Sequence, residues 1–132
     1  MTAVALEELR SHAAELGELY GVAVDIDQSG SQVFIIARDV ALPAGRYLVT
    51  TTDILLITDT QYPLSAMDMF WTDPAVLCVD GSVPASAESI ETHAGREWRR
   101  FSWHRNGWKP AGNALVDHFA FCQARFSPDI AP

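Results

Sequence analysis

The 132-residue sequence predicts an α+β fold, with an N-terminal helix, an antiparallel β-meander, an irregular active-site region and a C-terminal helix. Two observations predict it. Apolar residues recur at helical spacing near both ends of the chain. Between them, strand-like segments follow one another at hairpin spacing, so the sheet they form is antiparallel. Such a sheet packs on the apolar faces of the helices, and the length suits one domain over residues 1–132.

The N-terminal helix is predicted from an apolar stripe whose members step by three and four residues: Leu6, Leu9, Ala13, Leu16 and Tyr20. Thr2 is suited to cap its start, and Gly21 is suited to end it. Because strands follow directly, we expect this stripe to lie on the sheet.

The strands are predicted from apolar and β-branched segments separated by turn residues: 22–26, 33–37, 47–52, 53–57 and a segment at Phe70–Trp71. Pro63 cannot donate a ladder hydrogen bond, so residues 60–63 are expected to leave the sheet. Residues 81–89 are rich in small residues and predict a long loop, of a size that is either functional or mobile.

Aromatic alternation predicts a further strand over residues 97–104, with Trp98 facing away from Phe101 and Trp103. A second amphipathic helix, ended by Pro128, is then predicted from Leu115, Phe119, Cys122 and Phe126.

The composition is that of an ordinary soluble protein, with 48% hydrophobic and 20% charged residues. The longest apolar stretches are far shorter than the roughly 20 residues of a membrane span. The acidic N-terminus does not resemble a secretory signal. We therefore expect a cytoplasmic protein that does not bind membranes.

No metal or cofactor site is expected. Cys78 and Cys122 lack a CxxC spacing and have no histidine at ligand spacing, which disfavours zinc. A disulfide between them stays open, although cytosolic thiols are usually reduced. The sequence also has neither a Gly-rich phosphate loop nor a paired-carboxylate signature, so a small-molecule enzyme is disfavoured.

Charge is divided along the chain. Residues 1–91 contain three arginines and fourteen acids, a net charge of −11, whereas residues 92–132 contain six basic and three acidic residues, a net charge of +3. The acidic part would repel nucleic acid. The division suits docking to a charged protein partner, but a solvated basic strand on an acidic protein would give the same pattern.

The order of motifs is the most specific feature. Tyr62-Pro63 follows an apolar strand, a second strand follows a short link, and Trp108-Lys109-Pro110 precedes the last helix. This layout resembles the ubiquitin-conjugating (UBC) superfamily. The blocks LPAGRYLVTTTDILLITDTQYPLSAMDMFWTDP and GREWRRFSWHRNGWKP resemble its bacterial group, prokaryotic family E, more closely.

The resemblance implies a role in a bacterial ubiquitin-like conjugation pathway. The implied partners are a ubiquitin-like protein, an activating enzyme and, by the usual gene neighbourhood of the group, a JAB-type protease. It also implies that residues 92–108, just before the last helix, contain the active site.

The nucleophile departs from the eukaryotic pattern, because the sequence has no His-Pro-Asn tripeptide. Cys78 lies in a Leu-Cys-Val-Asp context similar to that of the family, but 30 residues before Trp108. Ser102 lies six residues before Trp108, close to the position at which the family has its nucleophile. The Trp-x-Pro register favours Ser102.

Acyl transfer needs a nucleophile, oxyanion donors and, for a serine, a general base. His104 is expected on the same strand face as Ser102 and is a candidate base, and His93, approaching from the loop, is a second candidate. Docking to acidic surface on the partner is expected of Arg96, Arg99 and Arg100, with Trp103 in an aromatic patch. Each has a structural alternative: Ser102 and His104 as ordinary strand residues, Cys78 as a buried small hydrophobe, and Trp103 as core.

Two functions follow. The chain is an acyl carrier that accepts an activated ubiquitin-like protein on Ser102 or Cys78 and passes it on. Alternatively, it is a non-catalytic UBC-fold module that holds the ubiquitin-like protein or the activating enzyme. Fold alone does not decide between them.

Overall fold

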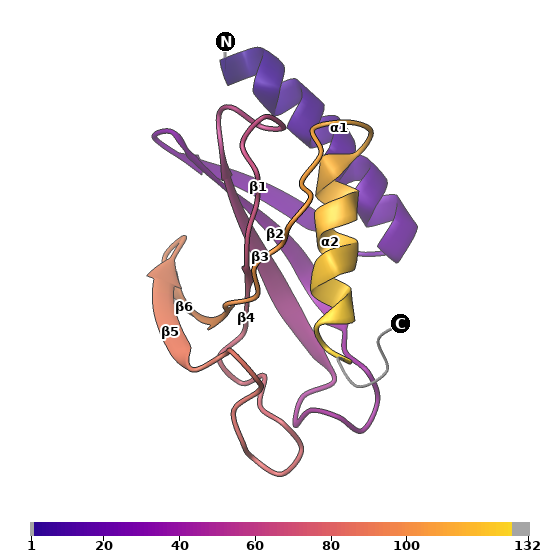
Figure 1. The fold of residues 1–132 in the computed structure, drawn as a ribbon, viewed down its shortest axis with the longest axis vertical. Helices are drawn as coiled ribbons and strands as arrows, with labels where there is room; N and C mark the ends of the chain where they lie inside the picture. The colour runs from indigo at the N-terminus through magenta and orange to yellow at the C-terminus, as the bar shows by residue number, and fades with distance from the viewer. Residues whose placement is uncertain (1, 128–132) are drawn as a thin grey trace.

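The computed structural model describes residues 2–127. Two helices and six strands follow in the order α1 (Thr2–Tyr20), β1 (Val24–Ser29), β2 (Gln32–Ala41), β3 (Thr51–Asp59), β4 (Phe70–Thr72), β5 (Ser89–His93), β6 (Arg96–Phe101) and α2 (Ala114–Ala124). All neighbouring strands are antiparallel, in the order β1-β2-β3-β4-β6-β5. Both helices lie on one face of the sheet (Figure 1). The predicted α+β, UBC-like plan is confirmed.

The main core lies between this face and the helices. From α1 it takes three members of the predicted stripe (Leu9, Ala13 and Leu16), while Leu6 is partly buried against it and Tyr20, at the helix end, is 40% exposed. From α2 and the turn that follows it, the main core takes the whole predicted set: Leu115, Phe119, Cys122 and Phe126. The helix pattern in the sequence therefore does report the face that is buried.

A second, smaller apolar cluster lies on the other face of the sheet and consists of Phe34, Ile36, Leu55, Trp71 and Trp98. Because side chains alternate along a strand, the neighbours of these residues in β2 and β3 point into the main core. Burial on both faces explains why residues 33–37 form a continuous apolar run. Trp98 and Phe101 fall in different clusters, as the aromatic alternation predicts.

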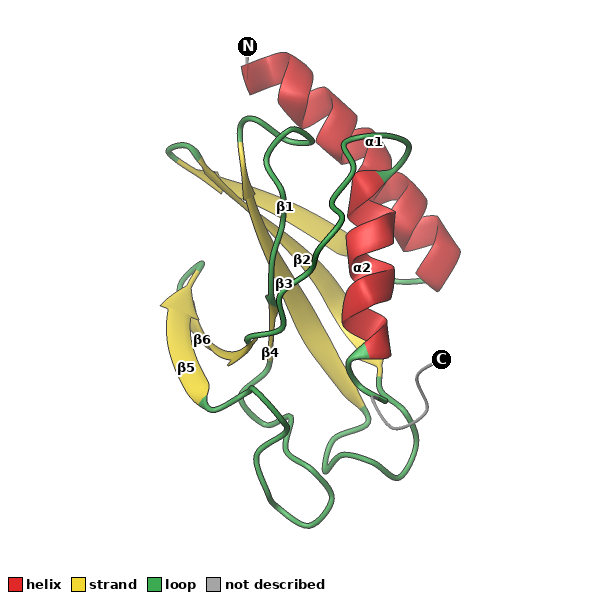
Figure 2. Ribbon diagram, viewed as in Figure 1, coloured by secondary structure: helices red, strands yellow, loops and turns green. Residues whose placement is uncertain are grey.

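The β5–β6 hairpin extends the sheet beyond β4, as the strand ribbons in Figure 2 show. Its turn is formed by Ala94 and Gly95, which both have positive φ, the backbone that a two-residue hairpin turn requires. The sequence interpretation missed β5.

All of the predicted strands differ in extent from those observed, and two differ most. The strand expected over residues 97–104 is β6 and ends at Phe101, where its partner β4 begins at Phe70. The strand expected over residues 47–52 is wrong before Thr51. Tyr47 lies in an isolated bridge with Cys78 instead of a strand, and the Leu48 N–H donates to the Leu77 carbonyl, because this stretch pairs with a loop instead of the sheet.

The helix ends agree with expectation in part. Gly21 follows α1 with φ +65°, as predicted for a helix-ending glycine. Thr2 already belongs to the helix, so the capping position, like the predicted stop at Pro128, lies outside the described residues. Asn113 caps α2, because its Oδ1 accepts the Val116 N–H at 2.9 Å.

The Tyr62-Pro63 step leaves the sheet, as predicted, and connects both helices. The Tyr62 side chain is buried; its hydroxyl accepts the Leu115 N–H at 3.0 Å and lies 2.6 Å from His12 Nδ1. Next to it, Trp108 Nε1 donates to the Pro63 carbonyl at 2.9 Å. The two motifs singled out in the sequence are thus in direct contact.

We expect Tyr62→Phe to destabilise the fold by about 1–3 kcal/mol, because the Leu115 N–H and His12 would lose a buried partner. Urea denaturation at neutral pH measures this difference. Tyr20→Phe is the control: Tyr20 is exposed and its ring contact with Phe119 is kept, so its free energy of unfolding should change by less than about 0.5 kcal/mol. Equal effects of the two substitutions would contradict this role of Tyr62.

His118 gives the fold a pH dependence. Its ring is buried; Nε2 lies 3.0 Å from the Met69 carbonyl and Nδ1 lies 3.5 Å from Arg105 Nη1. The pKa of His118 is lowered to about 4, chiefly by burial and also by the nearby Arg105 charge, while the bond to the Met69 carbonyl and the Asp68 charge oppose this. The folded state therefore holds a neutral imidazole.

The unfolded chain binds a proton at His118 below its ordinary pKa of 6.5, whereas the folded chain does not until about pH 4. Stability contributed by neutral His118 is thus present above pH 6.5 and is lost as the pH falls towards 4. We expect His118→Gln, which does not titrate, to lose less stability than the natural chain over this window, measured by urea denaturation at several pH values. Parallel losses in the two proteins would contradict it.

Candidate functional site

The candidate site lies where β6 ends and the irregular segment 102–113 begins. This segment runs across the sheet to α2 (Figure 1). Backbone and side-chain bonds fix its course: the Trp103 carbonyl accepts the Met69 N–H at 3.1 Å, and the Arg105 N–H donates to Asp68 Oδ1 at 2.7 Å. Ser102 is its first residue, so its backbone is held on one side by the sheet.

Ser102 is half-buried, and its hydroxyl meets a cation. Arg100 Nε donates to Ser102 Oγ at 2.8 Å. The Ser102 backbone N–H donates to the Ser86 carbonyl, also at 2.8 Å. The oxygen is therefore in a fixed position beside a permanent positive charge, which favours negative charge on it.

Glu91, on β5, lies at the centre of a polar network around Arg100. Glu91 Oε2 accepts from Arg100 Nη1 at 2.7 Å. Its Oε1 accepts from Trp71 Nε1 and lies against His93 Nε2, both at 2.9 Å. The hydrogen bond from His93 lowers the pKa of Glu91; burial opposes this, and the Trp71 bond and the Arg100 charge add to the lowering. Glu91 is therefore an ionised carboxylate at neutral pH.

His104 forms no described hydrogen bond with Ser102. Its side chain is 75% exposed, and Nδ1 lies 2.6 Å from Asp68 Oδ2. Burial alone would raise the pKa of Asp68, but the bonds from His104 and from the Arg105 N–H lower it. Because β6 ends at Phe101, the alternation that would bring His104 to the face of Ser102 stops before both residues. Among the residues that the structure describes, no histidine is hydrogen-bonded to Ser102.

Cys78 lies in the long loop between β4 and β5. It is half-buried and free, and its N–H and carbonyl form a turn with Ser82 and Gly81. It lines an open pocket of about 410 Å³ with Arg46, Asp80 and others. None of the described contacts joins Cys78 to Ser102, so the structure presents the two candidate nucleophiles separately. Cys122 is a buried core residue, and burial raises the pKa of its thiol well above the ordinary value.

The predicted docking residues have internal partners. Arg96 pairs with Asp53 and Asp73, and its guanidinium lies 4.0 Å above the Trp98 ring. Arg96 and Arg100 both keep about a third of their side chains exposed. These two residues can therefore still meet a partner.

Arg99 differs, because it is only 9% exposed. Its guanidinium donates to the carbonyls of Pro74 and Ala87, at the two ends of the long loop. Trp103 is half-buried against the main core, with the Arg125 guanidinium 5.3 Å from its ring. Of the four, Arg99 is the least exposed, and its guanidinium nitrogens already donate to backbone carbonyls.

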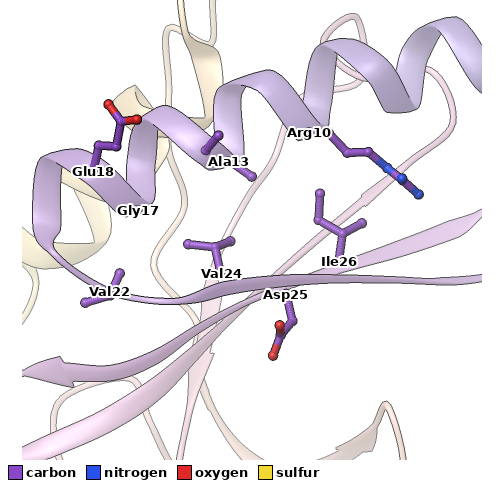
Figure 3. Close-up of a pocket in the computed structure, with 9 residues that line it drawn as sticks. Arg10, Ala13, Gly17, Glu18, Val22, Val24, Asp25 and Ile26 are labelled. Carbon is purple, nitrogen blue, oxygen red and sulfur yellow. The ribbon is translucent and has the colours of Figure 1, made fainter.

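A larger open pocket, of about 580 Å³, lies between α1 and β1 at the opposite edge of the sheet. Figure 3 shows Val24 and Ile26 pointing from the strand towards the helix, and Asp25 pointing away. Its lining is mainly small and apolar, with charged side chains at the rim. It contains no residue of the candidate site.

Sequence reasoning missed Glu91, Trp71 and Asp68 as site residues. A hairpin signal was present, since the alternating segment 89–93 is followed by Ala94-Gly95 and a second strand. Asp68 lies far from His104 in sequence, and the Met69–Trp103 and Asp68–Arg105 hydrogen bonds bring the two segments together. Within residues 2–127 there is no cluster of metal-ligating side chains, and no helix there is long and apolar enough to cross a membrane.

The model of the family described as prokaryotic E2 family E matches residues 11–127. The match covers every strand, α2, the Tyr62-Pro63 step, Cys78 and Ser102. A search for curated relatives gives no match, and neither does a search of solved structures. The chain belongs to prokaryotic E2 family E, and is thus a UBC-like protein of bacterial ubiquitin-like conjugation.

Proposed function

We propose that the protein is an acyl carrier for a ubiquitin-like protein, with Ser102 as the carrying residue. It accepts the cargo from an activating enzyme and passes it to an amine or hydroxyl of a target. The observation that supports Ser102 is its fixed, half-buried hydroxyl, which accepts a hydrogen bond from Arg100 at the start of the irregular segment. The family membership supports a ubiquitin-like protein and an activating enzyme as partners.

The loading step is a transesterification. Ser102 Oγ attacks the carbonyl carbon of the thioester that joins the cargo to the activating enzyme. The C–O bond forms, the C–S bond breaks, and the hydroxyl proton leaves with the enzyme thiolate to give a thiol. The leaving thiolate can accept this proton, so loading does not require a histidine in contact with Ser102.

Cys78 is the second candidate carrier. A thiol is intrinsically the better nucleophile, and Cys78 is free and reaches a surface pocket. No charged group is hydrogen-bonded to its sulfur among the described residues, in contrast to Ser102 Oγ. This difference is the reason for placing Ser102 first.

A non-catalytic binding module is the alternative function. The observation that favours it is the arrangement of His104, which is paired with Asp68 and leaves Ser102 without a described general base. In a module, Arg96, Arg100 and Trp103 would contribute contact surface to the ubiquitin-like protein.

The proposal of an acyl carrier also includes a cytoplasmic location and a JAB-type protease that removes the cargo.

Charging with the cognate activating enzyme, ubiquitin-like protein and ATP tests this function. We expect intact mass spectrometry to show a cargo-sized addition that hydroxylamine removes and dithiothreitol at neutral pH does not, because an oxyester resists thiols. Ser102→Ala should abolish the addition, whereas Cys78→Ala should leave it unchanged.

Three other outcomes would contradict parts of the proposal. If the cargo-sized addition persists in Ser102→Ala but is lost in Cys78→Ala and is removed by dithiothreitol, the carrier is Cys78. An addition resistant to hydroxylamine would indicate an amide and a modified lysine. No addition, with the activating enzyme shown to be charged, would indicate the binding module, which should still bind the cargo after both substitutions.

A further inference from the structure

We infer that Arg100 stabilises negative charge on Ser102 Oγ and that Glu91 positions Arg100 for this purpose. The inference rests on the proposed carrier role of Ser102 and extends it to the two residues that make an oxyester chemically workable. Neither residue is recognisable from a motif, because the hairpin that contains Glu91 brings them together only in the folded chain.

Negative charge develops on Oγ in both halves of the transfer. In loading, it develops as the hydroxyl proton leaves. In discharge, a target amine attacks the ester carbonyl, the C–Oγ bond breaks, and Oγ leaves as an alkoxide that regains a proton from the amine. An alkoxide is a much poorer leaving group than a thiolate, so a serine carrier needs charge stabilisation more than a cysteine carrier does.

Arg100 has the geometry for this role. Its Nε–H points at Oγ, at 2.8 Å, and the guanidinium stays charged at all relevant pH values. The contact is already made in the protein without cargo, so Arg100 need not move when negative charge develops on Oγ.

Glu91 fixes the orientation of the guanidinium. The carboxylate accepts from Arg100 Nη1, on the other side of the guanidinium from the contact with Ser102. The carboxylate itself is fixed by Trp71 Nε1, from β4, and by His93, two residues along β5. A cross-strand ion pair would by itself account for the bond to Glu91, but it does not account for the direction of Nε towards Oγ.

The charged and titratable groups that face this site come from two strands. Arg100, on β6, is in direct contact with Oγ, and Glu91 and His93, on β5, are reached through Arg100. Arg100 and Glu91 have side chains 31% and 30% exposed, so solvent weakens the field without removing it.

A thiol placed at position 102 measures this field without any cargo. The test uses Ser102→Cys in a Cys78→Ala background, with the alkylation rate by iodoacetamide followed against pH and assigned to residue 102 by peptide mass spectrometry. We expect the midpoint to lie on the order of one pH unit below the ordinary thiol value. Cys122 does not interfere, because it is buried.

Adding Arg100→Gln should return the midpoint to the ordinary thiol value. Arg10→Gln, which removes the same charge from α1 at a distance, is the matched control and should leave the midpoint unchanged. If Arg100→Gln alone unfolds the chain, as judged by circular dichroism, the double substitution Arg100→Gln and Glu91→Gln removes the unpaired carboxylate and should give the same return. A midpoint that is insensitive to Arg100 in a folded variant would overturn the inference.

The substitution Glu91→Gln tests whether Glu91 positions Arg100, because the two possibilities shift the thiol midpoint in opposite directions. Loss of a nearby negative charge would by itself lower the thiol midpoint further, whereas loss of the group that orients Arg100 would raise it. We expect a rise. A fall would show that Arg100 stays in place without Glu91 and would overturn the positioning role.

The charging assay on the natural chain is read separately from this titration. A lowered thiol midpoint with no cargo adduct would overturn the carrier function and leave the charge-stabilising site standing. An adduct on Ser102 with a thiol midpoint that does not respond to Arg100 would support the carrier and overturn the inference.

Discussion

The arrangement of the helices on the sheet depends on one buried hydroxyl. Tyr62 follows β3, yet its oxygen joins the Leu115 N–H, in the first turn of α2, to a histidine of α1. A helix start leaves N–H groups without helical partners, and a buried one is costly if nothing accepts it. Burial raises the pKa of this phenol well above its ordinary value, so it remains neutral and can both accept and donate. The Trp108–Pro63 bond next to it fixes the irregular segment in the same place.

The candidate site is built on the opposite edge of this arrangement, by a hairpin added to a short strand. β4 has only three residues, and β6 continues the sheet from it. The side chains of Trp71, Arg100 and Glu91 share the face turned away from the helices, since they are cross-strand or diagonal neighbours. The indole N–H of Trp71, whose ring belongs to the small apolar cluster, is thus joined through Glu91 to the Arg100 guanidinium that contacts Ser102. The site is supported by rigid strands, although Ser102 itself begins a loop.

Much of the fold could be predicted from the sequence, because the helix stripes, the continuous run of β2 and the Tyr-Pro and Trp-x-Pro steps report local geometry directly. The errors have a common physical cause. Residues 47–50 have strand-forming side chains but pair with a loop, and residues 102–104 continue an aromatic alternation after the ladder has ended. A strand ends where its partner strand ends, and the sequence of β6 does not show that its partner β4 has only three residues. The distance from Trp108 selects Ser102 as the candidate, whereas Glu91 emerges only from the pairing of β5 with β6.

Arg99 closes the long loop near both of its ends, which bears on how much its length can change. Its guanidinium joins the carbonyls of Pro74 and Ala87, so the two ends of the loop are closed on a buried cation instead of on each other. Between these carbonyls, Leu77 and Cys78 still pair with residues 47–48, and the Ser86 carbonyl still accepts the Ser102 N–H, whereas the turn at Gly81 lies outside these contacts. Because the entropy of closing a loop grows only slowly with its length, insertions around the Gly81 turn would change the free energy of folding little. A change of length confined to the Gly81 turn therefore leaves the register of the sheet edge that presents Ser102 unchanged.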